Sequence, residues 1–288
     1  MKMIDAKTKL FCVIGDPIEH SMSPVMHNTA FEHMNLNCAY TAFRVRKEGL
    51  EDAIRGMKAL GITGANVTIP HKVEVMKHLD ELSEEARIIG AVNTIKIGEK
   101  LEGYNTDGMG ALRALRSGGA DPKGKSVLMI GSGGAARAIA VTLGLKGGPS
   151  SITILGVEKD ELNKLAGDVS KGTEVRAEGR IMTDETLREE LEKADLLIHC
   201  TPVGMHPKVD NTLVTADLFH EDLKVMDIVY NPLETRLLRE AKKAGVKTTI
   251  SGIDMFVNQG AESLRIWLGI DPPVEVMKRV VASELSKG

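Results

Sequence analysis

The sequence predicts an α/β fold with two domains, and three observations support this prediction. Short apolar runs alternate with amphipathic stretches along the chain, as expected for βα units around largely parallel sheets. One apolar run near the middle of the chain is followed directly by a glycine-rich segment. A chain of 288 residues is also long enough for two domains of ordinary size.

The first half of the chain alternates candidate strands with candidate helices. Ser23 is a suitable N-cap for the first helix, and Pro24 suits the first helical turn. The strands are predicted at residues 10–14, 39–45, 64–67 and 91–97, and the helices at 24–34, 48–60 and 83–89. A connecting helix at residues 107–117 then leaves this domain.

A second unit begins near Lys123 with an apolar strand at residues 126–130, the glycine-rich turn and an alanine-rich helix. Its later elements are strands at 151–155, 195–200, 225–230 and 246–250, with helices between them, for example at 159–169 and 234–244. The tail is predicted to be helical at 256–268 and 273–285, with no strand of its own. We therefore expect the C-terminal helices to return to the first domain, which would comprise residues 1–107 and 253–288, with a second domain at 108–252.

Composition excludes several classes of function. The formal net charge of −3 is too balanced to favour nucleic acid or an anionic membrane as the main partner. Cys12, Cys38 and Cys200 are far apart, which argues against a disulfide framework or a zinc site. The N-terminus lacks a signal-peptide core, and no apolar run approaches the roughly 20 residues that span a bilayer. We expect a cytoplasmic protein that needs no metal.

The glycine-rich segment fits the dinucleotide-binding pattern GxGxxG/A. It follows a predicted strand and opens a predicted helix, which is the context that this pattern requires. Gly131 permits the tight turn, Gly133 lets the backbone approach a pyrophosphate, and Ala136 allows close contact between helix and strand. The segment reads Gly131-Ser132-Gly133-Gly134-Ala135-Ala136. The helix N-terminus then offers N–H groups and a partial positive charge to phosphates.

The end of the next strand bears on the choice between NAD and NADP. Glu158 stands where an acidic residue usually holds the adenosine ribose diol, although it could equally be a solvated residue at a helix N-terminus. Arg137, Lys159 and Lys164 could instead favour a 2′-phosphate. The residues alone leave both cofactors open.

Four polar segments of the first half stand where strands should end, and ligands bind at such ends in open α/β sheets. Hydroxyls, amides, a lysine and an aspartate suit a small polyhydroxylated acid. Each group also has a purely structural interpretation as a helix cap, turn former or solvated lysine. The segments are Ser21-Met-Ser23-Pro24, Asn66-Val-Thr68-Ile-Pro70-His-Lys72, Gly90-Ala-Val-Asn93-Thr94 and Tyr104-Asn105-Thr106-Asp107-Gly108.

Together with the glycine-rich segment, these motifs resemble the shikimate dehydrogenase family. Thr201-Pro202-Val-Gly204-Met205 and Asp227-Ile228-Val-Tyr230-Asn231-Pro232 are also similar to the family's motifs. The similarity runs in order from about residue 10 to residue 268. It implies two α/β domains with a cleft between them, substrate on the first and NADP, or NAD, on the second.

The resemblance also implies roles for individual residues. Lys72 and Asp107 would be the catalytic pair. The expected substrate ligands are Ser21, Ser23 and Tyr230 at the carboxylate and Thr68, Asn93, Asp107 and Gln259 at the ring hydroxyls. The expected cofactor contacts are Gly131, Ser132, Gly133, Gly134 and Ala135 at the pyrophosphate, Ile228 and Gly252 at the nicotinamide, and Glu84 near it, with Arg137 and Glu158 as further candidates.

Two departures from the family pattern stand out. Many members carry Asn-Arg-Thr after the second strand of the cofactor domain, with the arginine at the 2′-phosphate, whereas this chain has Gly156-Val157-Glu158. Asp254 also stands where a glycine is common. The first departure weakens the expectation of NADP.

The expected activity is the reversible reduction of 3-dehydroshikimate to shikimate, with Lys72 transferring the proton and Asp107 positioning it. An NAD-dependent quinate or shikimate dehydrogenase is the alternative, although Ser23 favours shikimate because quinate-preferring relatives tend to have threonine there. A non-catalytic binding relative is a third possibility, but such a protein would be free to lose Lys72 and Asp107. The expected partner is a small-molecule substrate, and the expected state is a monomer or homodimer.

Overall fold

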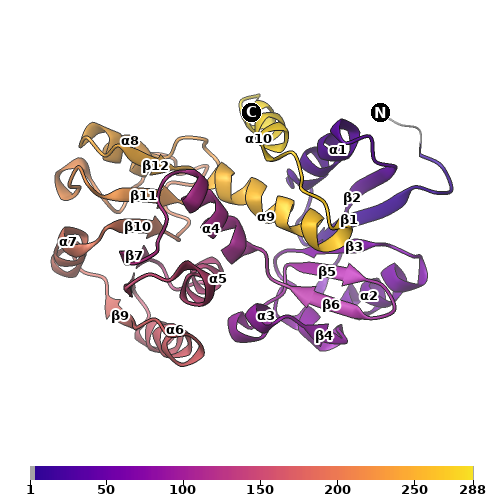
Figure 1. Cartoon of the computed structure of the whole chain (residues 1–288), viewed down its shortest axis with the longest axis horizontal. Coiled ribbons are helices and arrows are strands. Elements are labelled where there is room, and N and C mark those ends of the chain that lie inside the picture. The colour runs from indigo at the N-terminus through magenta and orange to yellow at the C-terminus, as the bar shows by residue number, and fades with distance from the viewer. Residues whose placement is uncertain (1–3, 288) are drawn as a thin grey trace. The chain divides into compact units, whose positions relative to one another are not determined.

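The computed structural model describes residues 4–287 and has the α/β architecture that the sequence predicts (Figure 1). The chain divides into two compact units, each built around a six-stranded sheet. Unit 1 comprises Met1–Thr106 and Gln259–Gly288, and unit 2 comprises Asp107–Asn258. Unit 1 is therefore assembled from both ends of the chain, whereas unit 2 is a continuous segment.

The sheet of unit 1 is mixed, in the order β2-β1-β3-β5-β6-β4. β1 pairs in parallel with β2 and β3, whereas β5 is antiparallel to both β3 and β6. The strands are β1 Lys9–Gly15, β2 Cys38–Arg44, β3 Gly64–Val67, β4 Glu81–Leu82, β5 Thr94–Ile97 and β6 Leu101–Tyr104.

This sheet corrects one prediction for the first half of the chain. The single strand predicted at 91–97 is shorter and begins at Thr94, and it is followed by an unpredicted partner, β6. Three of the five strand pairings of this sheet are parallel, as expected, and the two that involve β5 are antiparallel. A close antiparallel hairpin replaces the expected βα crossover, because only residues 98–100 separate β5 from β6.

The helices of unit 1 follow local signals in the sequence. Pro24 lies in the first turn of α1, and the hydroxyl of Ser83 caps α3 by accepting a bond from the backbone N of Ala86. Gly90 ends α3 in the left-handed conformation that favours glycine. The helices are α1 Ser23–His33, α2 Leu50–Ala59, α3 Glu84–Ile89 and α10 Val274–Leu285, with short 3₁₀ turns at Lys47–Gly49 and Glu74–His78.

The C-terminal segment returns to the first unit, as expected. Helix α9, Gly252–Leu268, belongs to unit 2 as far as Asn258 and to unit 1 from Gln259 onward. Within unit 1, α10 packs against α1. The Trp267 indole donates a 2.9 Å hydrogen bond to the carbonyl of Ile95. The tail therefore completes the core of unit 1.

The sheet of unit 2 has the order β12-β11-β10-β7-β8-β9, and all of its neighbouring strands are parallel. This is the doubly wound arrangement, in which strand order reverses beside the first strand of the unit, β7. The strands are β7 Ser126–Ile130, β8 Ser151–Gly156, β9 Ala177–Ile181, β10 Leu196–His199, β11 Lys224–Asp227 and β12 Thr248–Ile250.

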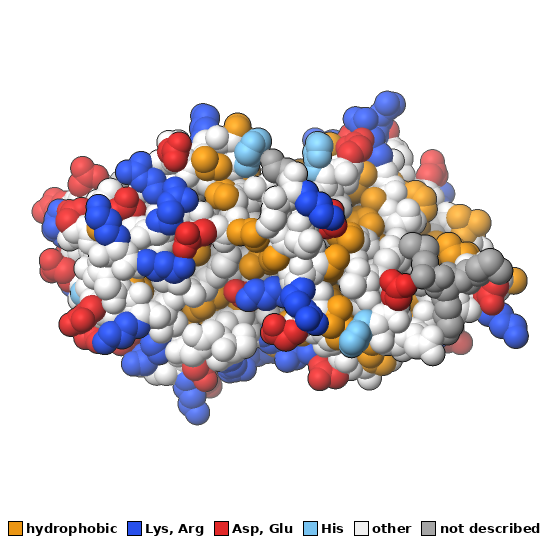
Figure 2. Space-filling view, turned by 90° about the horizontal axis from the view of Figure 1, so that it is seen from above, with side chains coloured by type: hydrophobic (Ala, Val, Ile, Leu, Met, Phe, Trp, Pro, Cys, Tyr) orange, Lys and Arg blue, Asp and Glu red, His pale blue; other side chains and the backbone are white. Residues whose placement is uncertain are grey.

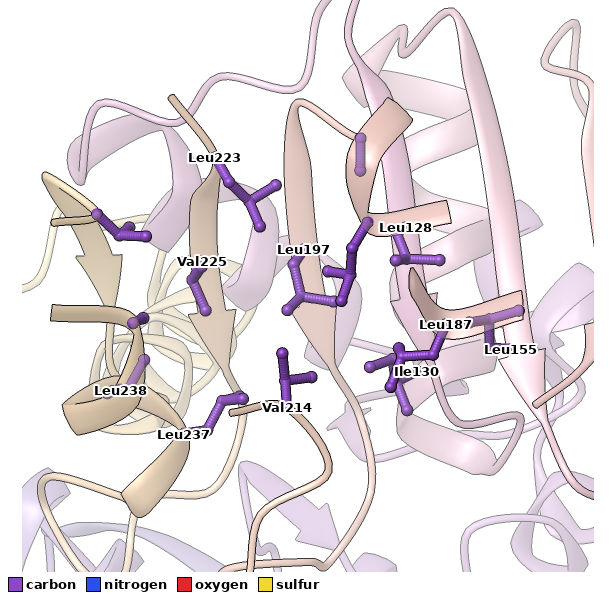
Figure 3. Close-up of a cluster of buried hydrophobic side chains, with 14 residues drawn as sticks. Leu128, Ile130, Leu155, Leu187, Leu197, Val214, Leu223, Val225, Leu237 and Leu238 are labelled. Atoms are coloured by element: carbon purple, nitrogen blue, oxygen red, sulfur yellow. The ribbon is translucent and has the colours of Figure 1, made fainter. Parts of the chain in front are cut away.

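The core of unit 2 is a layer of aliphatic side chains on its central strands (Figure 3). Leu128, Leu197 and Val225 come from β7, β10 and β11, and Leu237 and Leu238 come from α8. The remaining helices are α4 Asp107–Ser117, α5 Gly134–Thr142, α6 Lys159–Gly172, α7 Asp184–Lys193 and α8 Arg236–Lys243, with a π turn at Leu143–Gly147 and a 3₁₀ turn at Ala216–Leu218.

Within residues 4–287, no helix is long and apolar enough to cross a membrane, and no group of three or more His, Cys, Asp or Glu side chains is arranged to hold a metal ion. The three cysteines are free thiols. Positive and negative side chains are interspersed on the face shown in Figure 2, so neither sign dominates that face.

Candidate active site

Asn66 is the centre of a buried hydrogen-bonded network in unit 1. Its amide nitrogen lies 3.0 Å from both Thr94 Oγ1 and Ser263 Oγ, and its Oδ1 accepts a 2.7 Å bond from the Tyr40 hydroxyl. Burial raises the pKa of Tyr40 well above its usual value, so its hydroxyl stays protonated and donates. Asn66 is only 8% exposed and lies within β3, so it is not a turn former.

The network continues through Asn93 to Gln259. Asn93, 3% exposed, donates from Nδ2 to Thr106 Oγ1 at 3.0 Å and accepts at Oδ1 from the Thr106 backbone N at 2.8 Å. The Thr106 hydroxyl also lies 3.4 Å from Gln259 Oε1. Two of the predicted substrate ligands, Asn93 and Gln259, therefore share one threonine as a partner.

The segment that carries Thr68 and Lys72 is held by its backbone. The backbone N of Thr68 donates to the carbonyl of Ile14 at 3.0 Å, and the carbonyl of Lys72 accepts from the backbone N of Val92 at 2.7 Å. His71, 1% exposed, anchors the segment between them. The half-buried Lys72 side chain therefore projects from a segment that backbone hydrogen bonds hold on both sides.

Ser21 and Ser23 lie at the start of α1, and Ser23 is not the N-cap that the sequence predicted. The cap position is Met22, with no side-chain capping bond among the described residues, and Ser23 is the first residue of the helix. Ser23 is 8% exposed, and its backbone N donates to Ser21 Oγ at 3.3 Å. Since the Ser23 hydroxyl does not cap the helix, helix capping does not account for serine at this position.

Asp107 and Glu84 occupy the first turns of two different helices. Asp107 is the half-buried first residue of α4 and directly follows Thr106 of the buried network. Glu84 is an exposed first residue of α3. A Cβ on Gly108, the next residue after Asp107, would collide with Thr142 on α5, so glycine there lets α4 and α5 approach closely.

The glycine-rich turn of unit 2 has the form that a pyrophosphate needs. Gly131 has φ +111°, and a Cβ added there would lie 2.9 Å from the carbonyl oxygen of Cys200. A Cβ on Gly133 or Gly134 would meet no described atom within 4 Å, and both residues are exposed at the N-terminus of α5. An anion can therefore reach the first N–H groups of α5, with Ser132 and Ala135 beside it.

An acidic residue follows β8, and Arg137, a candidate to bind a 2′-phosphate, already forms an ion pair. Glu158 is the exposed N-cap residue of α6, and Val157 before it is 72% exposed. Ser132 donates to Glu161 at 3.1 Å, and Arg137 pairs with Asp168 at 2.7 Å. No arginine therefore follows β8 directly, and Arg137 already neutralises a carboxylate.

The segment after β11 carries the remaining predicted contacts. β11 ends at Asp227, before the predicted end at residue 230, so Ile228 and Tyr230 lie beyond the strand. Tyr230 stacks on Phe256 with ring centroids 4.9 Å apart, and burial raises its pKa. A Cβ on Gly252 would collide with the carbonyl oxygen of Ile228, so glycine lets α9 start against this segment.

Sequence reasoning missed the residues that support this network from a distance. Tyr40 lies in the middle of a strand, and Ser263 lies in a tail helix 197 positions from its partner Asn66. No local pattern marks either residue. Thr94 and Thr106 belonged to polar segments that the sequence did single out, although without a structural role.

Comparison with known proteins shows which family the chain belongs to. Over 285 residues the chain is 48% identical to the NADP⁺-dependent shikimate dehydrogenase of Methanopyrus kandleri, covering 98% of each sequence. The chain belongs to the shikimate dehydrogenase family. Models of the family's substrate-binding domain and of its C-terminal domain match residues 13–95 and 252–282.

Solved structures of shikimate dehydrogenases share the whole fold. One, in complex with NADP⁺, is 46% identical with a TM-score of 0.89 and covers 98% of both chains. Another, from Listeria monocytogenes in complex with shikimate and NAD, is 36% identical with a TM-score of 0.92, covering 98% of this chain and 99% of that one. The matches to the two shikimate dehydrogenase domain models include Asn66, Asn93 and Ser263 of the buried network.

Proposed function

We propose that this chain catalyses the reversible NADP(H)-dependent reduction of 3-dehydroshikimate to shikimate, a step towards chorismate and the aromatic amino acids. The observation that carries the proposal is the buried network around Asn66 and Asn93, in a chain that also has an open glycine turn. A fully bonded network of this kind fixes hydroxyl and amide positions, as recognition of a polyhydroxylated ring requires.

Lys72 is the proposed proton-transfer residue. In the oxidative direction, the neutral Nζ of Lys72 takes the proton of the reacting hydroxyl, and in reduction the ammonium returns it to the developing alkoxide. Asp107 is the proposed positioning residue, whose carboxylate would orient the lysine and the reacting hydroxyl. The bound nicotinamide supplies the hydride acceptor or donor.

The substrate ligands follow from the chemistry of the side chains. The hydroxyls of Ser21 and Ser23 donate to the substrate carboxylate, as does Tyr230, whose raised pKa keeps it protonated. Thr68, Asn93 and Gln259 hold the ring hydroxyls. Both Asn93 and Gln259 are already oriented by Thr106, which supports this assignment.

The proposed cofactor contacts lie on unit 2, except for Glu84 of unit 1, which is proposed to lie near the nicotinamide. The residues from Gly131 to Ala135 fit the pyrophosphate, and Ile228 and Gly252 line the nicotinamide. The related enzymes named above are described as NADP⁺-dependent or were solved with NADP⁺, which favours NADP for this chain.

We further propose that the enzyme is cytoplasmic and acts as a monomer or homodimer.

An NAD-dependent shikimate or quinate dehydrogenase is the second candidate, because one specific observation favours it. Exposed Val157 and Glu158 follow β8 where a 2′-phosphate would need a cation, and Arg137 is paired with Asp168. A carboxylate at this position bonds the free ribose diol and repels a phosphate.

A steady-state assay of shikimate and quinate, each with NADP⁺ and NAD⁺, tests both candidates. Preference for shikimate and NADP⁺ is the expected result. Preference for NAD⁺ or comparable use of quinate would support the second candidate. The absence of turnover in all four combinations would overturn the proposed activity and leave a non-catalytic binding protein.

A further inference from the structure

His199 lies in a buried hydrogen-bonded chain at the carboxyl edge of the unit 2 sheet. It is the last residue of β10 and is directly opposite Asp227, the last residue of β11. The two side chains are 2% and 0% exposed. His199 Nδ1 lies 2.9 Å from Asp227 Oδ1, and Nε2 lies 2.5 Å from Thr201 Oγ1. The imidazole is therefore held at both of its nitrogens.

The hydrogen-bond inventory of Asp227 fixes the orientation of this ring. Oδ1 also accepts from the backbone N of Val229 at 3.0 Å, and Oδ2 accepts from the Thr235 hydroxyl at 2.6 Å. Because each carboxylate oxygen already accepts from one of these two donors, we assign the proton of the His199–Asp227 hydrogen bond to Nδ1. Nε2 is then the nitrogen that is hydrogen-bonded to the Thr201 hydroxyl.

Through Thr201, this buried hydrogen-bonded chain supports the glycine-rich turn. A Cβ on Gly131 would lie 3.0 Å from the Thr201 methyl group and 2.9 Å from the carbonyl oxygen of Cys200. Thr201 thus packs its methyl group behind the first glycine of the turn while its hydroxyl faces His199. Any displacement of Thr201 towards Gly131 would move the turn itself.

Through Asp227, the same hydrogen-bonded chain fixes the backbone of the segment that is proposed to line the nicotinamide. The bond from Val229 to Asp227 fixes the backbone between Ile228 and Tyr230. Gly252 packs against the same backbone, at the carbonyl groups of Ile228 and Val229. The two cofactor-facing segments of unit 2 are therefore joined through one imidazole ring.

We propose that His199 is a positioning residue for the dinucleotide: its ring holds the segment behind the pyrophosphate turn and the segment that lines the nicotinamide in a fixed relation. The inference rests on the proposed function, since it assumes that a dinucleotide spans these two segments. His199 does not itself touch the cofactor. It acts through Thr201 and Asp227, and a ring that is 2% exposed has no access to substrate.

The test measures the Kd of NADP⁺ by calorimetry on the full-length chain, together with the Tm. Thr201→Val keeps the methyl group against Gly131 but removes the hydroxyl from Nε2. His199→Asn keeps a donor at the position of Nδ1, which satisfies the buried Asp227 carboxylate, but its side chain is too short to reach Thr201. Thr235→Val is the matched control, because it removes a donor from Asp227 and leaves both links of His199 in place.

Thr201→Val and His199→Asn should each raise the Kd of NADP⁺ about 10-fold, and the double variant should raise it no further, because both break the same link. Thr235→Val should lower the Tm and leave the Kd within about two-fold. The KM of shikimate should stay unchanged in all of them.

An unchanged Kd in Thr201→Val and His199→Asn, additive effects in the double variant, or an equal loss of affinity in Thr235→Val would each overturn the positioning role while leaving the proposed activity intact. A wild-type chain that binds neither NADP⁺ nor NAD⁺ would overturn the proposed function as well.

Discussion

The two regions that carry the candidate active site are built in opposite ways. In unit 1 the site is made of side chains, and Asn66, Asn93, Thr94 and Thr106 are 8% exposed or less and bonded to one another. In unit 2 the glycine-rich turn offers backbone at an exposed helix N-terminus. The first region should therefore be sensitive to loss of a polar group, and the second to gain of a carbon atom.

The largest expected effect is on turnover, at the proposed proton-transfer residue of unit 1. Lys72→Ala should lower kcat about 1000-fold in either direction, the range that general acid–base catalysis contributes. The Tm should stay unchanged, because the backbone bond from Val92 to Lys72 holds the segment. Steady-state kinetics and thermal denaturation measure the two quantities.

Lys77→Ala is the control for this variant, since Lys77 is an exposed lysine of the following 3₁₀ turn. Near-normal turnover in Lys72→Ala, with unchanged substrate KM, would remove Lys72 from the reaction.

Removal of the central amide of the network should have the next largest effect. Asn66→Ala leaves Tyr40, Thr94 and Ser263 short of a partner, so the free energy of unfolding should fall by about 3 kcal/mol. Urea denaturation measures the change. Asn163→Ala, at an exposed position of α6, should stay within about 0.5 kcal/mol of wild type. Equal losses in the two variants would show that the network adds no particular stability.

Two glycines of the same turn should separate stability from cofactor binding. Gly131→Ala combines a left-handed φ with a Cβ only 2.9 Å from the carbonyl oxygen of Cys200, so it should cost about 2 kcal/mol of folding free energy. Gly133→Ala meets no described atom, so it should fold normally and yet weaken NADP⁺ binding. Urea denaturation and calorimetry are the measurements, and normal cofactor affinity in Gly133→Ala would contradict the assigned role of the turn.

The smallest effect at neutral pH is that of a histidine packed against the network, which affects stability only as the pH falls. His27 is fully buried against Tyr40, no described group bonds either ring nitrogen, and burial lowers its pKa to about 3. Between about 6.5 and 3 the unfolded chain binds a proton that the folded chain does not, so stability falls as pH decreases. His27 should contribute up to about 1.4 kcal/mol per pH unit over this window.

His27→Leu should flatten this part of the stability profile, measured by urea denaturation from pH 7 to pH 4. His33→Gln, at an exposed position of the same helix, should leave the slope unchanged. A steep slope that persists in His27→Leu would assign the acid sensitivity to other groups.

The contrast between the regions also explains what the sequence could predict. The glycine-rich turn was recognisable because its strand, turn and helix are consecutive, and the family motifs named the polar segments of unit 1. The roles of Ser263 and Tyr40 could not be predicted, since they depend on contacts between positions that are distant in the sequence. β9 was missed because it is a partly exposed edge strand with Glu178 and Arg180 in its middle. His199 looked like the end of an apolar strand, and only the register with β11 brings it to Asp227.

The division of the chain has a consequence for its synthesis. Unit 2 is a single continuous segment and can fold as soon as it has left the ribosome. Unit 1 must wait for residues 259–288, because Ser263 completes the bonds of Asn66 and Trp267 fills the space beside Gly64. The part of the chain made first is therefore finished last, and the only tryptophan, Trp267, makes its fluorescence a natural reporter of that final step.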